Sequence, residues 1–251
     1  MADLGFTPGD RIVITGAASG IGRCAAVRAA ELGLAVEAWD LNLEGAESVA
    51  AEINDAGGRA LARGVDVGDY PAIEQAMQAA HAEGRVRYLV NNAGPPSYLD
   101  MSFDEGVRLV LGSVRTATDA WLAGEPGASS EPGAVGAAMC ATASVAGTMV
   151  GTGSNWYSAA KAGITGYVRH LAAYRTAEAR YNAVAPGMVG TPRLAGFTAS
   201  DLGQDILDRI PLGRVAEPDE IAWAVLFSLS PLASYLNGQV LVVDGGWSIT
   251  Q

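Results

Sequence analysis

Two side chains between Ser154 and Ile164 have the types and the spacing that proton transfer requires. Tyr157 and Lys161 are four residues apart, and on an α-helix this spacing places both side chains on one face. A phenol has a reference pKa of about 10, but a neighbouring ammonium group favours the phenolate and lowers that pKa. The pair could therefore act as a general acid and base. Ser144, which follows a strand pattern, could hold a substrate oxygen while the Tyr157 hydroxyl exchanges a proton with it.

A glycine-rich turn near the N-terminus decides how this pair is interpreted, because a Tyr and a Lys at this spacing are also common on exposed helix faces. The segment Arg11–Thr15 is typical of a buried strand, and it runs into the pattern G-x-x-x-G-x-G at Gly16–Gly22. A helical stretch, 21–32, follows and ends at Gly33. Glycines let the backbone approach a pyrophosphate, and the helix dipole favours its negative charge. The spacing departs from the common G-x-G-x-x-G fingerprint, so the strand before the turn and the helix after it are what favour a dinucleotide site.

A carboxylate at the end of the next strand pattern indicates which dinucleotide binds. The pattern covers 34–39 and ends at Asp40, which lies eighteen residues beyond Gly22. An acid about 20 residues after such a turn accepts hydrogen bonds from the hydroxyls of the adenosine ribose and repels a 2′-phosphate. Asp40 therefore favours NAD over NADP; the alternative is an Asp that only begins a loop.

Alternating strand and helix patterns predict an α/β fold. Further strands are expected at 60–65, 86–90, 134–143, 180–185 and 240–243, and further helices at 46–56, 71–82, 102–122 and from Pro218. This rhythm predicts a single domain, residues 1–251, with a doubly wound parallel sheet. Ligands bind such sheets at the carboxyl ends of the strands, where Asp40, Asp66 and Asn91 all fall. The irregular stretch 188–212, with a short helix at 199–210, is a candidate lid, and the Gly- and Pro-rich stretch 124–133 is expected to be a surface loop.

The composition limits the partners. The formal net charge is −11 and 49% of the residues are hydrophobic, which argues against nucleic acid and anionic membranes. No apolar run approaches the roughly 20 residues that a membrane helix needs, and the start lacks the pattern of a signal peptide. Cys24 and Cys140 form no CxxC pair, and His81 and His170 lie far apart, so neither a disulfide framework nor a metal site is expected. We expect a cytoplasmic protein that uses no metal.

Six motifs occur along the chain in a specific order. They are T-G-A-A-S-G-I-G at Thr15–Gly22, N-N-A-G at Asn91–Gly94, Ser144, Y-S-A-A-K at Tyr157–Lys161, N-A-V-A-P-G at Asn182–Gly187 and V-D-G-G at Val243–Gly246. In this order and at these separations they make the chain similar, from end to end, to the short-chain dehydrogenase/reductase family. The resemblance implies a Rossmann-type domain of about seven parallel strands between two helical layers. It also implies a homotetramer whose interfaces use the helices that contain Tyr157 and Ile221.

The resemblance implies a role for each residue of the site. Ser144 would orient the reacting oxygen, Tyr157 would exchange the proton, and Lys161 would bind the nicotinamide ribose and lower the pKa of Tyr157. The residues implied to bind the cofactor, NAD, are Thr15, Gly16, Ser19, Gly20, Ile21, Gly22, Asp40, Leu41, Asp66, Val67, Asn92, Ala93, Gly94, Tyr157, Lys161, Pro186, Gly187, Val189 and Thr191.

The substrate pocket is expected from residues that flank these motifs or lie on the candidate lid. They are Pro95, Pro96, Tyr98, Trp156, Met188, Leu194 and Phe197, together with Ser144 and Tyr157. Ordinary packing is the alternative for each of the flanking residues. Because most of them are apolar, we expect a secondary alcohol or ketone on an apolar skeleton, with a cyclic skeleton as one option.

One departure from the family concerns the mechanism. Family members usually carry an Asn on the helix after N-N-A-G, where it completes a catalytic tetrad through a water relay. The corresponding residue here is Ser113, in L-V-L-G-S-V-R. A Ser can still donate and accept a hydrogen bond, so Ser113 is included in the predicted catalytic set.

Three functions remain open on the sequence. The leading one is an NAD-dependent dehydrogenase or reductase that interconverts a secondary alcohol and a ketone. A 3-oxoacyl ketoreductase of fatty-acid or polyketide type usually needs NADPH and a basic surface for its carrier protein, and both Asp40 and the negative charge count against it. A non-catalytic protein that senses NAD or scaffolds partners is disfavoured by the intact Ser144, Tyr157 and Lys161.

Overall fold

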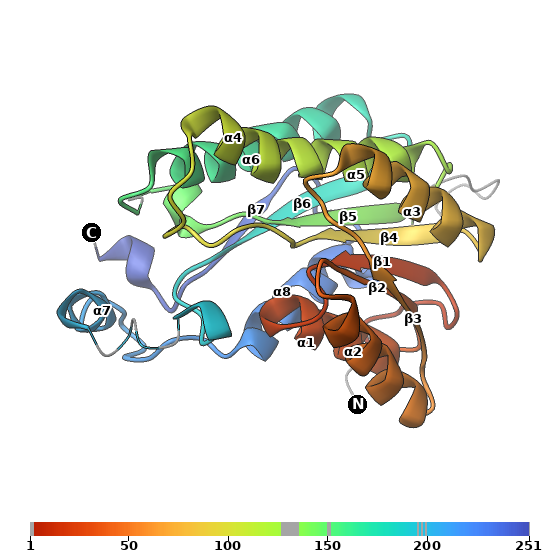
Figure 1. Cartoon of the computed structure of the whole chain (residues 1–251), viewed down its shortest axis with the longest axis horizontal. Helices are drawn as coiled ribbons and strands as arrows, with labels where there is room; N and C mark the ends of the chain where they lie inside the picture. The colour runs from red at the N-terminus through yellow and green to blue at the C-terminus, as the bar shows by residue number, and fades with distance from the viewer. Residues whose placement is uncertain are drawn as a thin grey trace.

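Seven parallel strands form one sheet in the order β3-β2-β1-β4-β5-β6-β7 (Figure 1). The structure, a computed structural model, describes residues 3–126, 136–149, 152–194, 196, 198 and 200–250. The strands are β1 (Arg11–Thr15), β2 (Ala35–Asp40), β3 (Arg59–Gly64), β4 (Val86–Asn91), β5 (Ala137–Thr142), β6 (Ala179–Pro186) and β7 (Val240–Val243). The chain moves outward from β1 to β3 and then crosses back to β4 on the other side of β1. This order confirms the predicted doubly wound, Rossmann-type sheet.

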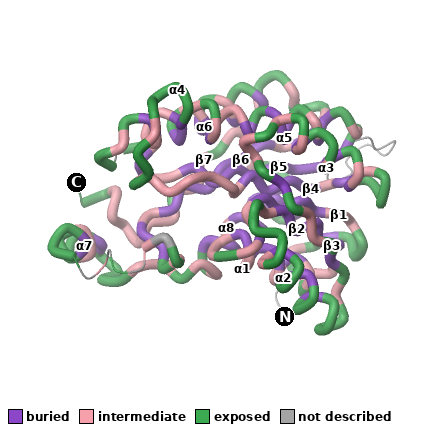
Figure 2. The backbone as a smooth tube through the Cα atoms, in the orientation of Figure 1, coloured by how far each residue is buried: buried purple, intermediate pink, exposed green. Residues whose placement is uncertain are grey.

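Helices cover both faces of the sheet. α1 (Gly20–Glu31), α2 (Leu43–Asp55) and α8 (Pro218–Leu229) lie on one face, and α3 (Tyr70–Ala82), α4 (Phe103–Val107), α5 (Ser113–Leu122) and α6 (Asn155–Tyr174) lie on the other (Figure 1). One hydrophobic cluster fills the space under each helical layer, and Figure 2 shows the buried residues concentrated along the strands. α7 (Asp201–Leu207) lies apart from both layers, on the same side as the C-terminus (Figure 1).

The apolar composition of α8 is explained by burial inside the chain. Ile221, Val225 and Leu229 are all fully buried, and α8 packs against α1, β5 and β6. An apolar helix of this kind fits either the core or a subunit interface, and the structure assigns Ile221 to the core.

The helix expected over 102–122 is interrupted by a π-helix, η1 (Arg108–Gly112), which separates α4 from α5. A π-helix changes the hydrogen-bond pattern of the backbone, and two hydroxyl groups bond to carbonyl oxygens of η1. Tyr70 donates to the carbonyl of Arg108 at 2.6 Å, and Ser113 donates to the carbonyl of Val110 at 3.1 Å. Tyr70 belongs to α3 and not to this segment. The hydrophobic periodicity of residues 102–122 therefore could not indicate that a π-helix interrupts the α-helix.

The other expected elements overlap the observed ones, with ends that differ by a few residues. The helix expected from residue 46 begins at Leu43, and the lid helix expected over 199–210 is observed as α7. Most of the expected loop 124–133 and the first two residues of the expected strand 134–143 lie outside the described residues.

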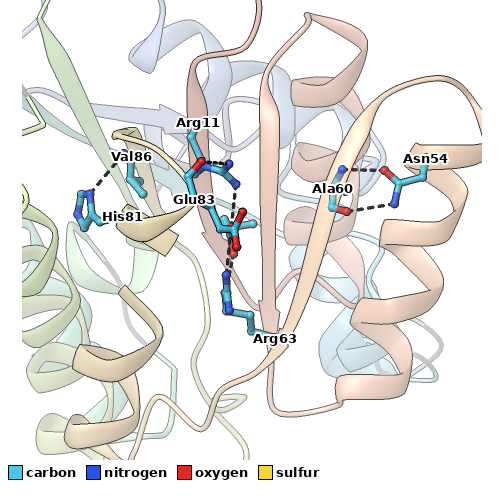
Figure 3. A network of polar contacts seen from close by, with 8 residues as sticks. Arg11, Asn54, Ala60, Arg63, His81, Glu83 and Val86 are labelled. Carbon is cyan, nitrogen blue, oxygen red and sulfur yellow. Dashed lines mark hydrogen bonds and ion pairs between the residues drawn. The ribbon is translucent and has the colours of Figure 1, made fainter. Parts of the chain in front are cut away.

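A buried carboxylate joins three neighbouring strands. Glu37 in β2 has a fully buried side chain, and it accepts hydrogen bonds from Arg11 of β1 at 2.8 Å and from Arg63 of β3 at 2.7 Å. Arg11 also donates to the backbone carbonyl of Glu83 at 2.7 Å, and Figure 3 shows the Arg11 and Arg63 side chains approaching each other between the strands. A buried charge is tolerated when it is paired in this way.

Replacing Glu37 with glutamine should destabilise the fold strongly. The side chains of Arg11 and Arg63 are only 14% and 25% exposed, and both would lose their counter-charge. We expect the free energy of unfolding to fall by about 2–4 kcal/mol, measured by urea titration and circular dichroism. Glu52→Gln removes a surface pair with Arg23 and is the control, with an expected change below about 1 kcal/mol. Equal unfolding midpoints for the two variants would contradict the prediction.

Candidate active site

The predicted site residues come together at the edge of the sheet where the strands have their carboxyl ends. The glycine turn follows β1, Asp40 ends β2, Asn92 follows β4, Ser144 follows β5 and Pro186 ends β6. All seven strands are parallel, so residues that are far apart in sequence share this edge. The topology therefore brings these residues to the edge at which sheets of this kind bind ligands.

The three glycines of the turn leave no room for a side chain at their own positions. Gly16 and Gly20 have positive φ angles of 71° and 55°, which favour glycine. A Cβ on Gly22 would overlap the carbonyl oxygen of Gly16 and lie 2.8 Å from the side-chain nitrogen of Asn92. A Cβ on Gly20 would lie 3.1 Å from the methyl group of Thr191, so the segment after β6 reaches the turn. A bare backbone with α1 directly behind it is the arrangement that accepts a pyrophosphate.

The carboxylate of Asp40 is held beside this turn. One oxygen accepts a hydrogen bond from the backbone N–H of Ala18 at 2.9 Å, and the other accepts one from the N–H of Asn42 at 2.9 Å. Each carboxylate oxygen can accept a further hydrogen bond, so Asp40 can bind two hydroxyl groups without leaving its position. Leu41, the next residue, is 74% exposed. The bond to Ala18 ties the end of β2 to the glycine turn, a contact that the sequence did not reveal.

Three strand ends are joined by a network around Asn92. The Thr15 hydroxyl accepts hydrogen bonds from the N–H groups of Asn92 and Ala93, both at 3.0 Å. The Asn92 amide donates to the carbonyl of Thr15 at 3.1 Å, and its oxygen accepts a hydrogen bond from the Thr142 hydroxyl at 3.1 Å. Thr15 and Asn92 therefore shape the cleft through β1, β4 and β5. Thr142 was missed by the sequence analysis, although it lies two residues before Ser144.

Lys161 is buried and fixed next to Tyr157. Its side chain belongs to the buried set, its Nζ donates to the carbonyl of Thr142 at 2.6 Å, and Nζ lies 5.6 Å from the centroid of the Tyr157 ring. The N-cap of α6 is Ser154, whose hydroxyl accepts a hydrogen bond from the N–H of Tyr157 at 3.4 Å. The end of β5 thus positions the ammonium group and the start of α6 positions the phenol. The predicted juxtaposition of Tyr157 and Lys161 is confirmed.

A short 3₁₀ turn, η2 (Val145–Gly147), brings Ser144 to the same helix. The Ser144 hydroxyl oxygen accepts a hydrogen bond from the N–H of Ala146 at 3.1 Å. A Cβ on Gly147 would overlap the backbone of Lys161 and lie 2.6 Å from the nitrogen of Ala162, so the turn packs directly on α6. Glycine is required for this close approach. Ser144, Tyr157 and Lys161 therefore belong to one packed unit.

The residues expected to contact the two ends of the cofactor differ in exposure. Asp66 is exposed and accepts a hydrogen bond from the N–H of Gly68 at 2.7 Å, while Val67 packs partly against the core. Gly187 lies against Asp244 and donates to the carbonyl of Val243 at 3.0 Å. Val189 is buried and paired with Ala216, so its side chain supports the segment around Thr191.

Two predicted site residues are buried in ways that the sequence did not indicate. Trp156 is 2% exposed and packs over Gly106, with its ring edge-to-face on Tyr157 at a centroid distance of 5.6 Å. It therefore supports Tyr157 from the core instead of lining open space. Ser113 is 4% exposed and its hydroxyl donates to the carbonyl of Val110. The Ser113 hydroxyl already donates to a backbone carbonyl of the π-helix, and a proton relay through it stays a prediction.

The expected substrate pocket is only partly described. Pro95, Pro96 and Leu194 are half-buried, and Tyr98 is 71% exposed. Met188 is buried at 7% exposure. Phe197 lies outside the described residues. These described residues thus follow β4 and β6, at the same edge of the sheet as Ser144 after β5.

In the part of the chain that the structure describes, no group of three or more His, Cys, Asp or Glu residues could hold a metal ion, and no helix there combines the length and the hydrophobicity that a membrane span needs. Burial raises the pKa of the Cys140 thiol to about 12, so this thiol stays neutral near pH 7. His170 is exposed and its ring lies against Tyr174, as the sequence predicted for a surface residue.

Comparisons with known proteins agree with this geometry. A family model described as enoyl-(acyl carrier protein) reductase matches residues 16–248. The chain is similar to cis-4-hydroxycyclohexanecarboxylate dehydrogenase of Sinomonas cyclohexanicum, with 38% identity over 94% of this chain and 95% of the relative. It is also similar to a 3-oxoacyl-(acyl-carrier-protein) reductase of Chlamydia muridarum (strain MoPn / Nigg), with 34% identity over 93% of this chain and 95% of the relative.

A solved structure extends the similarity to the whole fold. The 7α-hydroxysteroid dehydrogenase complexed with NADH and 7-oxo glycochenodeoxycholic acid has a TM-score of 0.87 and 30% identity, and the match covers 97% of this chain and 96% of that one. The strand order, the six motifs and these matches over nearly the full length agree. The chain belongs to the short-chain dehydrogenase/reductase family of oxidoreductases.

Proposed function

We propose that this protein transfers a hydride between NAD and a secondary alcohol or ketone. The observation that carries the proposal is the position of Lys161, whose buried ammonium group is held by the Thr142 carbonyl beside the ring of Tyr157. A cation next to a phenol favours the phenolate. Tyr157 can then accept a proton from an alcohol and, when protonated, donate one to a ketone.

The residues at the sheet edge fit a nicotinamide dinucleotide. The glycine turn presents bare backbone to a pyrophosphate, and the carboxylate of Asp40 lies at the turn, where it can accept hydrogen bonds from a ribose. A Cβ on Gly94 would meet no described atom within 4 Å, so there is room along the strand end after β4. Lys161 and Thr191 would hold the nicotinamide end. NAD, when bound, supplies the hydride acceptor.

The chain's own residues carry the proton and orient the substrate. In oxidation, the Tyr157 phenolate removes the proton from the alcohol oxygen while the carbinol hydrogen leaves as a hydride. In reduction, the Tyr157 hydroxyl returns a proton to the carbonyl oxygen. Ser144 donates a hydrogen bond to that same oxygen, and Gly147 keeps its turn against α6. Lys161 keeps a positive charge beside the phenol in both directions.

The proposed substrate is a secondary alcohol or ketone on an apolar, cyclic skeleton. The apolar residues Pro95, Met188 and Leu194 follow β4 and β6 at the edge of the sheet where Ser144 follows β5. Two of the compared proteins are named for cyclic substrates, a hydroxycyclohexanecarboxylate and a hydroxysteroid. Apolar side chains with a few polar groups among them are typical of sites that bind such a skeleton.

A 3-oxoacyl ketoreductase is the second candidate, and the Chlamydia relative favours it. It would use NADPH and bind an acidic carrier protein. The carboxylate of Asp40 opposes a 2′-phosphate, and a net charge of −11 opposes an acidic partner. Cofactor choice therefore separates the two candidates.

We also propose that the protein is a homotetramer. The two edge strands of the sheet are β3 and β7. Val242 of β7 is 43% exposed, and Phe227 of α8 and Leu232 of the turn after α8 are 38% and 62% exposed. An apolar sheet edge of this kind is usually covered. Light scattering coupled to gel filtration tests the assembly, and a monomer would count against it.

The function is tested by initial rates of nicotinamide reduction. A panel of cyclic and acyclic secondary alcohols is assayed with NAD and with NADP, and the corresponding ketones and an acetoacetyl thioester are assayed with NADH and NADPH. The proposal expects activity with NAD on cyclic alcohols. Activity confined to NADPH and the thioester would establish the second candidate. NADH binding without turnover on any substrate would favour a sensor or scaffold.

A further inference from the structure

The segment 65–70 comprises the loop between β3 and α3 and Tyr70, the first residue of α3. It carries Asp66 and Val67, which the family resemblance implies to contact adenine. We call it the adenine loop. It is a tight turn, in which Asp66 accepts a hydrogen bond from the N–H of Gly68 at 2.7 Å and Asp69 caps α3 through the N–H of Ala72. Asp66 is exposed. Its position therefore depends on Gly68, and contacts from elsewhere in the chain act on Asp66 by holding the backbone of Gly68.

Two side chains connect the adenine loop to the π-helix η1. Arg108 donates a hydrogen bond to the carbonyl of Gly68 at 3.3 Å, and its guanidinium carbon lies 5.4 Å from the centroid of the Tyr70 ring. In return, the Tyr70 hydroxyl donates to the backbone carbonyl of Arg108 at 2.6 Å. Loop and π-helix are thus joined by two hydrogen bonds and a cation–π contact. We call Tyr70 and Arg108 the latch.

Packing against η1 continues on both of its sides. A Cβ on Gly68 would lie 3.2 Å from a methyl group of Leu109, and a Cβ on Gly163 of α6 would lie 2.7 Å from a methyl group of Leu111. The π-helix therefore lies between the adenine loop and the helix that carries Tyr157. The backbone carbonyl of Arg108, which belongs to the π-helix, accepts the hydrogen bond from the Tyr70 hydroxyl. The backbone of the π-helix is therefore part of the latch.

We infer that Tyr70 and Arg108 are positioning residues that hold the adenine loop for the adenosine half of the dinucleotide. The inference rests on the proposed function, since it assumes that NAD binds along this edge. The latch acts on the adenine loop alone and has no part in the proton transfer. Loss of the latch should weaken binding of ligands that contain adenosine, and it should leave the nicotinamide half unaffected.

The test uses the full chain and three ligands. Tyr70→Phe removes the donor hydroxyl, and Arg108→Gln removes the guanidinium group. Dissociation constants are measured by calorimetry or fluorescence for NADH, for ADP-ribose and for reduced nicotinamide mononucleotide. We expect Kd for NADH and ADP-ribose to rise about fivefold in each variant, the factor that corresponds to one lost hydrogen bond. Kd for the mononucleotide should not change.

Arg115→Gln is the matched control. Arg115 lines the same surface groove of about 430 Å³ as Tyr70 and Arg108, but it is paired with Asp119 at 3.6 Å. This control should leave all three dissociation constants at the wild-type values. It changes the net charge by the same amount as Arg108→Gln.

Any other outcome overturns the inference. Unchanged binding of ADP-ribose by both latch variants would mean that the latch does not position the loop. An equal loss for the mononucleotide would indicate general loosening of the fold, and an equal loss in Arg115→Gln would indicate an effect of charge. If Tyr70→Phe does not fold, Arg108→Gln alone decides, because the Arg108 side chain is exposed. Failure of the wild type to bind NADH would refute the proposed function first, and the inference with it.

Discussion

Replacing Tyr157 with phenylalanine is expected to lower kcat about a thousandfold, the size of a general acid–base contribution. The ring stays in place, with Trp156 edge-to-face on one side and Lys161 on the other. Only the hydroxyl that exchanges the proton is lost. Binding of NADH should therefore be unchanged, and this is measured by fluorescence titration beside the rate assay.

Tyr167→Phe is the control for this experiment. Tyr167 lies on the same helix and is also partly buried, and burial raises the pKa of its phenol to about 12. The Tyr167 side chain lines the surface groove beside η1, away from the sheet edge, so its hydroxyl should have no effect on kcat. Turnover of Tyr157→Phe at the level of Tyr167→Phe would refute the assignment of the proton donor.

Replacing Asp40 should have the second-largest effect, on the choice of cofactor. Asp40→Asn removes the charge that repels a 2′-phosphate and keeps one oxygen, which can accept from the N–H of Ala18 or of Asn42 but not from both in the present geometry, because the amide nitrogen is only a donor. Asp40→Ala removes the acceptors as well. We expect kcat/KM for NAD to fall about tenfold or more in Asp40→Ala, as one or two charged hydrogen bonds are lost. In both variants the preference for NAD over NADP should shrink.

Asp55→Asn makes the same change in net charge at the exposed end of α2. It should leave the ratio of kcat/KM values for NAD and NADP as in the wild type. If Asp40→Asn keeps the full wild-type preference, Asp40 is not the residue that binds the ribose. A drop in the Asp55→Asn ratio would instead point to the overall charge of the protein.

The fold and the placement of the site at one sheet edge were predictable because their signals are local. A β-branched run such as Arg11–Thr15 fits a buried strand by its own composition. Gly16, Gly20 and Gly22 mark a tight turn, and the φ angles and close contacts at these positions exclude a side chain there. The spacing of Tyr157 and Lys161 needs only a helix to bring the two together. Each of these predictions depends on a few neighbouring residues, and the parallel sheet then places all strand ends at one edge.

The partners that hold the site were decided by tertiary structure alone. Thr142 connects Asn92, fifty residues before it, to Lys161, nineteen residues after it, and both contacts depend on the register of β4, β5 and α6. The burial of Glu37 between two arginines and the bond from Tyr70 to the π-helix have the same origin. Trp156 and Ser113, which the sequence placed in the site, are both buried: Trp156 packs on Gly106 of α4 and the Ser113 hydroxyl donates to Val110 of η1. The sequence by itself determined which backbone conformations and which reactive groups are present. Long-range packing determined what each polar group bonds to, because a buried donor or acceptor must take the partner that the neighbouring element brings within reach.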